Sequence, residues 1–210
     1  MNLWIFGDSY SCEWDIVKGE RHKEYVKDYK PILHISNIIK KELNCDNVYN
    51  GARSGNCNYS ILQSICECID KIKKDDIVII GWSEITRWRS LSFGEEWRVV
   101  GVNFNRTSEA FRKESVNRDC KRVVNEINSW IKLLNVTLPN QIIHWTPFQK
   151  LKNSHPKLNI HTPPFHMKRI NELYNNPDTH ITEEGHVDIS KWLISMISKT
   201  KEYEKDKTAI

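Results

Sequence analysis

The sequence lacks several features that would place it in a class at once. It contains no apolar run near the roughly 20 residues that span a bilayer. A signal peptide is also not indicated, because no basic stretch opens the chain and the first apolar run is only Leu3 to Phe6. We therefore expect a cytoplasmic protein with no membrane partner.

The sequence also lacks Cys-x-x-Cys pairs and a large excess of charge of one sign. None of the six cysteines forms a Cys-x-x-Cys pair, so no zinc site is indicated. Six scattered cysteines in a chain of this length are typical of a reduced protein. The chain has 31 basic and 27 acidic residues, a net charge of +4, and no basic stripe. Nucleic acid is thus not an expected partner, and nothing indicates the oligomeric state.

What the sequence does have is an alternation of short apolar runs and helical periodicity. The length of 210 residues suits one domain, which we expect over 1–198, followed by a charged, flexible tail over 199–210. An irregular insert is expected over 82–117, and mostly loop over 150–177. The patterns predict strands near 3–6, 47–50, 77–80 and 141–145, and helices near 31–43, 58–72, 108–134 and 181–198.

This alternation predicts an α/β fold with a parallel sheet covered by helices on both faces. The run Ile77–Ile80 is continuously apolar and β-branched, as expected for a strand buried on both sides. In such sheets the functional site lies outside the carboxyl ends of the strands. The segments 7–9, 50–58, 81–84 and 146–147 should therefore converge.

The first candidate for chemistry is Ser9 in "FGDSYS", directly after the first strand. A serine hydroxyl becomes a nucleophile when a base takes its proton, and the oxyanion that forms then needs donors. The alternative is ordinary turn chemistry, in which Ser9 caps a helix and Asp8 accepts from loop amides.

Two further stretches supply the other parts of such a site. "NPDTHITEEGH" contains Asp178 and His180, the residue types of a base and its orienting carboxylate. "NGARSGNCN" contains Gly55 in a turn whose backbone N–H groups could meet an oxyanion. The alternatives are a capping aspartate beside a surface histidine, and a plain strand-to-helix turn.

Together and in this order, the stretches resemble the sequence blocks of SGNH, or GDSL-type, hydrolases. "FGDSYS" resembles the first block, which implies Ser9 as nucleophile, and "NGARSGNCN" resembles the second, which implies Gly55 as an oxyanion donor beside the Ser9 N–H. "DTHITEEGH" resembles the last block, which implies catalytic Asp178 and His180. The resemblance also implies a three-layer α/β/α sandwich, flavodoxin-like, with a five-stranded parallel sheet. No cofactor or metal is implied. Some compact members of this family are encoded by bacteriophages.

The third block departs from the family pattern. "IIGWSE" stands where the family has Gly-x-Asn-Asp, so Ser83 replaces an asparagine whose amide helps to bind the oxyanion, and Glu84 follows it. A hydroxyl can donate one hydrogen bond, so we expect Ser83 as a substitute in a weaker oxyanion hole. Asn56 or Asn58 could compensate.

The last block departs in its spacing. The family has Asp-x-x-His, whereas this chain has Asp178-x-His180. A fallback pair, Glu183 and His186, does have the three-residue spacing, but His186 would lie inside the helix.

The resemblance implies acyl transfer through an acyl-enzyme on Ser9. We expect an esterase, or a deacylase of carbohydrate O-acetyl groups, acting on a small-molecule or glycan ester. Further candidates for shaping the site or contacting substrate are Asp8, Asn56, Asn58, Trp82, Glu84 and Arg87. Simple packing is the alternative for Trp82. The competing hypothesis is a non-catalytic protein that binds a glycan or nucleotide on the same scaffold, because Ser83 weakens the oxyanion hole.

Overall fold

The computed structural model describes residues 1–8, 10–12, 33–53, 55–83, 88–91, 97–100, 120–138, 141–147, 156–164 and 183–208. Among the described residues, no helix combines the length and apolarity needed to cross a membrane. In chain order the elements are β1 (Leu3–Phe6), α2 (Ile35–Leu43), β2 (Val48–Asn50), α3 (Asn58–Cys66), the 3₁₀ turn η1 (Ile69–Lys71), β3 (Ile77–Gly81), β4 (Trp88–Leu91), β5 (Trp97–Val100), α5 (Cys120–Thr137), β6 (Gln141–Trp145) and α8 (Glu183–Thr208).

The main sheet has the strand order β2-β1-β3-β6, and every pairing in it is parallel. Leu3 in β1 lies opposite Val48 of β2 on one side and Ile77 of β3 on the other. The predicted parallel sheet is confirmed, and its four strands are those expected from the apolar runs.

The five strands implied by the family resemblance are not all found among the described residues. One further segment does pair with the sheet, because His161 forms a parallel bridge with Trp145 of β6. The His161 N–H donates to the His144 carbonyl at 2.8 Å, and the Thr146 N–H donates to the His161 carbonyl at 2.9 Å. The segment 156–164, expected as loop, therefore extends the sheet beyond β6 at one residue.

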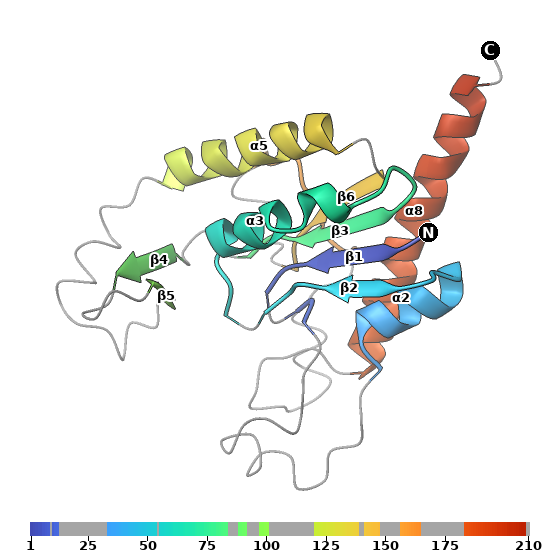
Figure 1. The fold of residues 1–210 in the computed structure, drawn as a ribbon, viewed down its shortest axis with the longest axis horizontal. Helices are drawn as coiled ribbons and strands as arrows, with labels where there is room; N and C mark the ends of the chain where they lie inside the picture. The colour runs from blue at the N-terminus through green and yellow to red at the C-terminus, as the bar shows by residue number, and fades with distance from the viewer. Residues whose placement is uncertain are drawn as a thin grey trace, which may run out of the picture.

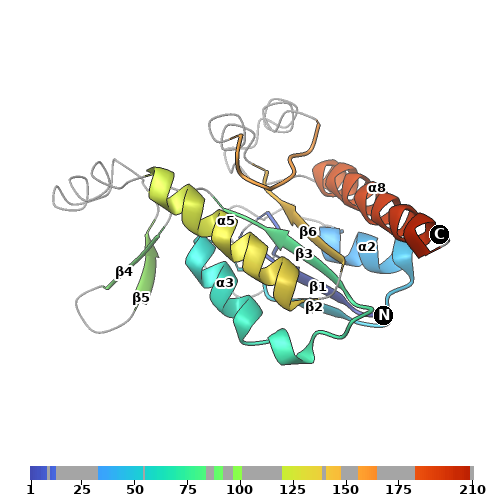
Figure 2. The same ribbon diagram turned by 90° about the horizontal axis from the view of Figure 1, so that it is seen from above.

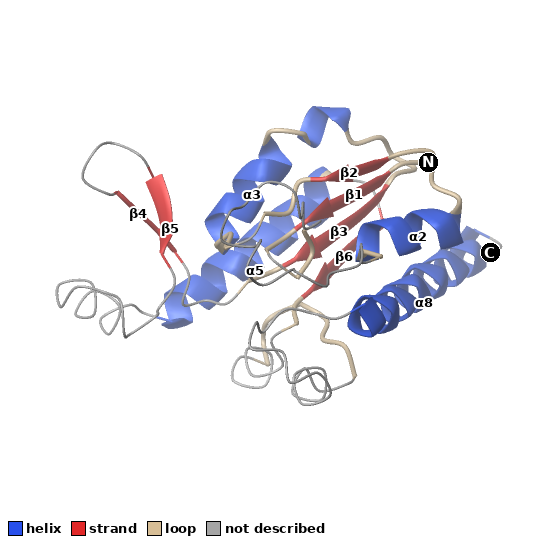
Figure 3. Ribbon diagram, turned by 90° about the horizontal axis from the view of Figure 1, so that it is seen from below, coloured by secondary structure: helices blue, strands red, loops and turns tan. Residues whose placement is uncertain are grey.

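Alternate side chains of each strand enter two separate cores, so the molecule has three layers (Figures 1 and 2). One core lies under α3 and α5 and includes Trp4, Phe6, Val78 and Ile80. The other lies under α2 and α8, which Figure 3 shows side by side on their face of the sheet, and includes Leu3, Ile5, Ile77 and Ile79. The predicted burial of both faces and the three-layer α/β arrangement are confirmed.

Two helices end elsewhere than the periodicity predicts. Helix α3 ends at Cys66 rather than near 72, since the Cys68 N–H donates to the Ile65 carbonyl and tightens the chain into the 3₁₀ turn that follows. Helix α8 continues past 198 to Thr208, through the tail expected to be flexible. Residues 199–208 contain no proline or glycine and are rich in lysine and glutamate, which favour helix.

The insert expected to be irregular contains an antiparallel strand pair. Trp88 of β4 lies opposite Val100 of β5, and Leu91 lies opposite Trp97. Figure 1 shows the pair on the α3 side of the molecule, apart from the main sheet. Each strand is only four residues long, too short for a period-two pattern to stand out in the sequence.

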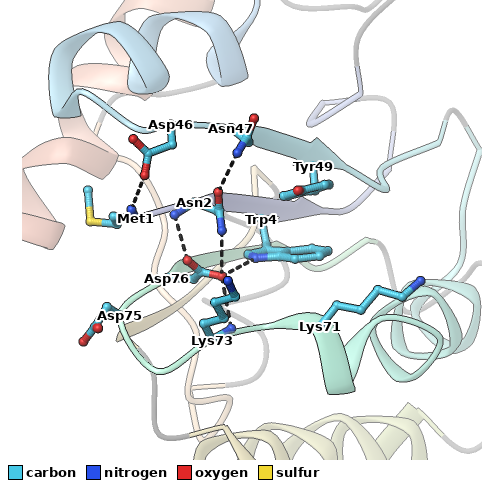
Figure 4. A pocket seen from close by; sticks show the side chains of 10 residues that line it. All are labelled: Met1, Asn2, Trp4, Asp46, Asn47, Tyr49, Lys71, Lys73, Asp75 and Asp76. Carbon is cyan, nitrogen blue, oxygen red and sulfur yellow. Dashed lines mark hydrogen bonds and ion pairs between the residues drawn. The ribbon is translucent and has the colours of Figure 1, made fainter.

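A buried carboxylate, Asp76, fixes the edge of the sheet where the strands begin (Figure 4). Its Oδ1 accepts the Asn2 N–H at 2.7 Å, and its Oδ2 accepts the Trp4 indole N–H at 2.9 Å and the Lys73 N–H at 3.1 Å. Burial alone raises the pKa of Asp76, but the hydrogen bonds from Trp4, Asn2 and Lys73 outweigh it and hold the pKa below its ordinary value.

Asp76 borders a pocket of about 560 Å³, whose lining includes Tyr49, stacked on Trp4 with ring centroids 4.2 Å apart. The Asp76 carboxylate accepts hydrogen bonds from donors of the protein itself. This edge is opposite the carboxyl ends of the strands, so we assign Asp76 a structural role.

Replacing Asp76 by alanine should lower the free energy of unfolding by about 2–4 kcal/mol, because the buried Trp4 indole N–H loses its acceptor. Urea unfolding at neutral pH measures the change. The neighbouring, exposed Asp75 provides a matched control, and Asp75→Ala should change stability by less than about 0.5 kcal/mol. Equal effects of the two substitutions would contradict this role. In the wild type, the contribution of Asp76 is present above the unfolded pKa of about 3.9 and is lost as pH falls further.

Candidate functional site

The carboxyl ends of β1 and β3 lie side by side at the centre of the sheet. Strand β1 pairs with β2 on one side and β3 on the other, so the chain connections run in opposite directions from this point. Crevices at such switch points are where open α/β sheets bind ligands. Phe6 lies opposite Ile80, which brings the following residues, Gly7 and Gly81, next to each other.

The loop after β2 is fastened to the end of β1. The Gly7 carbonyl accepts the Arg53 N–H and the Asn56 side-chain amide, both at 3.1 Å, and the Ile5 carbonyl accepts the Gly51 N–H at 2.8 Å. Gly55 lies in this loop, exposed, with a φ of 78° that favours glycine. No described residue accepts the Gly55 N–H. The predicted convergence of loops 7–8 and 50–58 is confirmed for their described residues.

Asp8 and Ser83 join the ends of β1 and β3. Asp8 is 1% exposed, and its Oδ2 accepts the Ser83 hydroxyl at 2.8 Å, while its Oδ1 accepts the Tyr10 N–H at 3.1 Å. Ser83 is fully buried. The residue that we expected as a substitute oxyanion donor therefore directs its hydroxyl toward the carboxylate that precedes Ser9 in the sequence.

The two asparagines expected to aid an oxyanion hole each bind backbone. The Asn58 carboxamide accepts the Ser83 N–H at 2.7 Å and donates to the Ser83 carbonyl at 3.0 Å. The Asn56 amide donates to the Gly7 carbonyl. Both side chains are buried and link the loop after β2 to its neighbouring strands.

Trp82 lies in the core and presents no surface to a substrate. Its ring is 0% exposed, and its indole N–H donates to His144 Nδ1 at 3.2 Å. An indole nitrogen can only donate, so Nδ1 carries no proton, and Nε2 donates to Asn135 Oδ1 at 3.0 Å. The substrate-contact hypothesis for Trp82 is corrected by this burial, because strand alternation continues from Val78 and Ile80 to position 82.

Burial, followed by the charge of His161, lowers the pKa of His144 to about 4. As the pH is lowered from 6.5 to 4, the unfolded chain therefore binds a proton that the folded protein does not. The free energy of unfolding decreases over this range. His144→Gln retains a donor and an acceptor without titrating, so its stability should fall less steeply over this range. Urea unfolding at several pH values measures the slope. The exposed His161→Gln serves as a comparison and should flatten the slope less than His144→Gln, because the charge of His161 is the smaller cause of the lowered His144 pKa. An unchanged slope in His144→Gln would contradict the assignment.

Ser11 explains why glycines stand where both central strands end. A Cβ on Gly7 or on Gly81 would lie 2.5 Å from Ser11 Oγ, and one on Gly81 would also lie 3.1 Å from Trp145 Nε1. Both of these polar atoms are buried without a hydrogen-bond partner among the described residues. The Ser11 carbonyl accepts the Asn50 amide at 3.0 Å, which ties the same turn to β2. Our sequence interpretation missed Ser11, and glycines ending two strands were the signal available.

Gly81→Ala should destabilise the protein by about 1–3 kcal/mol through overpacking, and adding Ser11→Ala should recover much of the loss. Gly7→Ala gives the contrast, because its new Cβ would also lie 2.7 Å from Ser11 Cβ, which alanine retains. Ser11→Ala should therefore rescue the Gly81 variant and fail to rescue the Gly7 variant. Thermal unfolding of the five variants decides this, and equal rescue of both glycine variants would show that Ser11 Oγ is not the obstacle.

The remaining predicted site residues lie outside the described part of the chain: Ser9, Glu84, Arg87, Asp178 and His180. Of the fallback pair, the Glu183 side chain also lies outside it. His186 is buried, with its ring centroid 5.3 Å from that of His34, and burial followed by the charge of His34 lowers its pKa to about 3. A general base works best with a pKa near the working pH, so this environment does not support the fallback.

Residues that could hold a metal do not gather in the described part of the chain. No group of three or more His, Cys, Asp or Glu side chains lies together there.

The architecture is similar to that of known esterases. No family model and no curated protein matches the sequence. Among solved structures, the psychrotrophic esterase EstA from Pseudoalteromonas sp., inhibited by monoethylphosphonate, is 13% identical with a TM-score of 0.51, over 96% of this chain and 98% of its own.

Two other solved structures give the same result. A Bacteroides fragilis protein assigned as an acylhydrolase is 13% identical with a TM-score of 0.53, over 95% of this chain and 87% of its own. A lipolytic G-D-S-L family member from Veillonella parvula is 12% identical with a TM-score of 0.50, over 94% and 98%. This chain therefore has the fold of GDSL-type hydrolases.

Proposed function

We propose that the protein is a serine hydrolase that cleaves a small ester, with Ser9 as the nucleophile. The observation that carries the proposal is the meeting of three strand ends at the switch point. There the Gly7-Asp8 turn that precedes Ser9 is fastened by Asn56 on one side and by Ser83 on the other. The structural neighbours with this fold include an esterase and a protein assigned as an acylhydrolase.

In the proposed reaction, Ser9 Oγ attacks the ester carbonyl carbon while His180 takes the hydroxyl proton. Asp178 orients the imidazole. The oxyanion accepts hydrogen bonds from the N–H groups of Ser9 and Gly55. Collapse breaks the bond to the alkoxy group, which leaves as an alcohol with the proton from His180.

Water then attacks the acyl-enzyme, gives a proton to His180, and releases the acid as Ser9 regains its hydrogen. Transfer to another alcohol would use the same residues. The substrate class we propose is a small-molecule or glycan ester, such as a carbohydrate O-acetyl group.

A fluorophosphonate probe tests the proposal without a guess at the acyl group. Phosphonate chemistry suits the question, because the neighbouring esterase EstA is inhibited by monoethylphosphonate. The wild-type protein should gain the mass of one phosphonyl group, read by intact mass spectrometry. Ser9→Ala and His180→Ala should gain none, since one lacks the nucleophile and the other lacks the base.

Ser11→Ala is the matched control, because it removes the serine two positions further along the chain and should remain labelled. A folded wild-type protein that takes no label would contradict catalysis through Ser9. That result would favour the alternative of a non-catalytic scaffold that binds a glycan or nucleotide.

A further inference from the structure

The buried carboxylate of Asp8 lies one residue before the proposed nucleophile. A carboxylate at 1% exposure is stable only where donors replace the water it has lost. Two of its donors are the Tyr10 N–H on Oδ1 and the Ser83 hydroxyl on Oδ2. The first comes from the same turn, whereas the second crosses from β1 to the end of β3. The Ser83 hydroxyl therefore connects Asp8, at the end of β1, to the neighbouring strand.

Ser83 is itself held in place on both sides of its peptide. Asn58 accepts the Ser83 N–H and donates to the Ser83 carbonyl. Since the side chain is also fully buried, its hydroxyl is a fixed donor rather than a mobile surface group. The geometry thus provides a rigid support for Asp8 across the switch point.

A count of protons decides between two roles for Ser83. A carboxylate only accepts, so the proton in the Ser83–Asp8 hydrogen bond belongs to the serine, which has one to give. While that bond exists, Ser83 cannot donate to an oxyanion. Breaking it would leave the buried Asp8 carboxylate with one donor fewer. The cost in free energy would be substantial, because hydrogen bonds to charged groups are stronger than those between neutral groups.

The asparagine of the family's third block differs because its carboxamide has two protons. One can serve a carboxylate while the other serves an oxyanion. We infer that Ser83 in this chain is a positioning residue that holds Asp8, and through it the turn of Ser9, and that the oxyanion hole relies on backbone N–H groups. The inference rests on the proposed function for its catalytic consequence.

Double-mutant cycles separate this role from that of an oxyanion donor. The first-order rate of fluorophosphonate labelling, at saturating probe, should fall roughly 10- to 100-fold in Ser83→Ala as the nucleophile's turn shifts. Asp8→Ala should cause a similar loss, and Ser83→Ala should add little in the Asp8→Ala background. A direct oxyanion donor would act independently of Asp8, so two losses that multiply would overturn the inference.

Ser83→Asn provides a second test, in which we expect the labelling rate to increase. Its two amide protons can support Asp8 and also reach the oxyanion, so labelling should be faster than in the wild type by on the order of 10-fold. Labelling as slow as that of Ser83→Ala would count against the inference. Ser190→Ala is the control: this buried serine donates within its own helix to the His186 carbonyl, and its loss should leave the labelling rate unchanged.

Urea midpoints of the same variants give a readout independent of labelling. If Ser83 holds Asp8, the variant that combines Ser83→Ala with Asp8→Ala should have a urea midpoint no lower than that of the less stable single variant. Additive shifts in the midpoint would overturn the positioning role. If the wild-type protein takes no label, the proposed hydrolase function fails, and the urea cycle still decides whether Ser83 holds Asp8.

Discussion

The candidate site depends on the close approach of two strand ends, at Gly7 and Gly81. Strands β1 and β3 run side by side to this point, and Ser11 covers both glycines so closely that no Cβ fits. This approach brings Asp8 and Ser83 within hydrogen-bonding distance. The loop with Gly55 is fastened to the carbonyl of Gly7 itself. Each element at the switch point is therefore placed relative to the same short stretch of β1.

Buried carboxylates lie at both ends of the central strand pair, and neutral donors support each. Asp76, at the amino end, accepts from two backbone N–H groups and from the side chains of Trp4 and Asn2. Asp8, at the carboxyl end, accepts one of its bonds from a side-chain hydroxyl. The hydrogen bond that joins Asp8 to the end of β3 comes from the Ser83 hydroxyl, so a substitution at this one position removes it.

Much of the fold could be predicted because the strands are short, apolar and buried on both faces. The run 77–80 predicted β3 directly, and continuing its alternation would have placed Trp82 in the core with Val78 and Ile80. The order of the strands in the sheet could not be predicted from the sequence. The sequence shows that Ser83 follows a strand, but the contact with Asp8 exists only because β3 lies beside β1. The β4–β5 pair was missed because four-residue strands give too little pattern.

The fold is shared with solved esterases at only 12–13% identity, so this architecture forms although most side chains differ. In this chain the positive φ of Gly55 and the hydrogen bond from the Arg53 N–H to the Gly7 carbonyl belong to the backbone, so they follow from the path of the chain. A side-chain donor has no such protection. At position 83 the chain can exchange an amide for a hydroxyl and turn that hydroxyl toward Asp8, as long as backbone N–H groups still face the reacting carbonyl. Variation at this position is thus compatible with the same architecture and the same proposed chemistry.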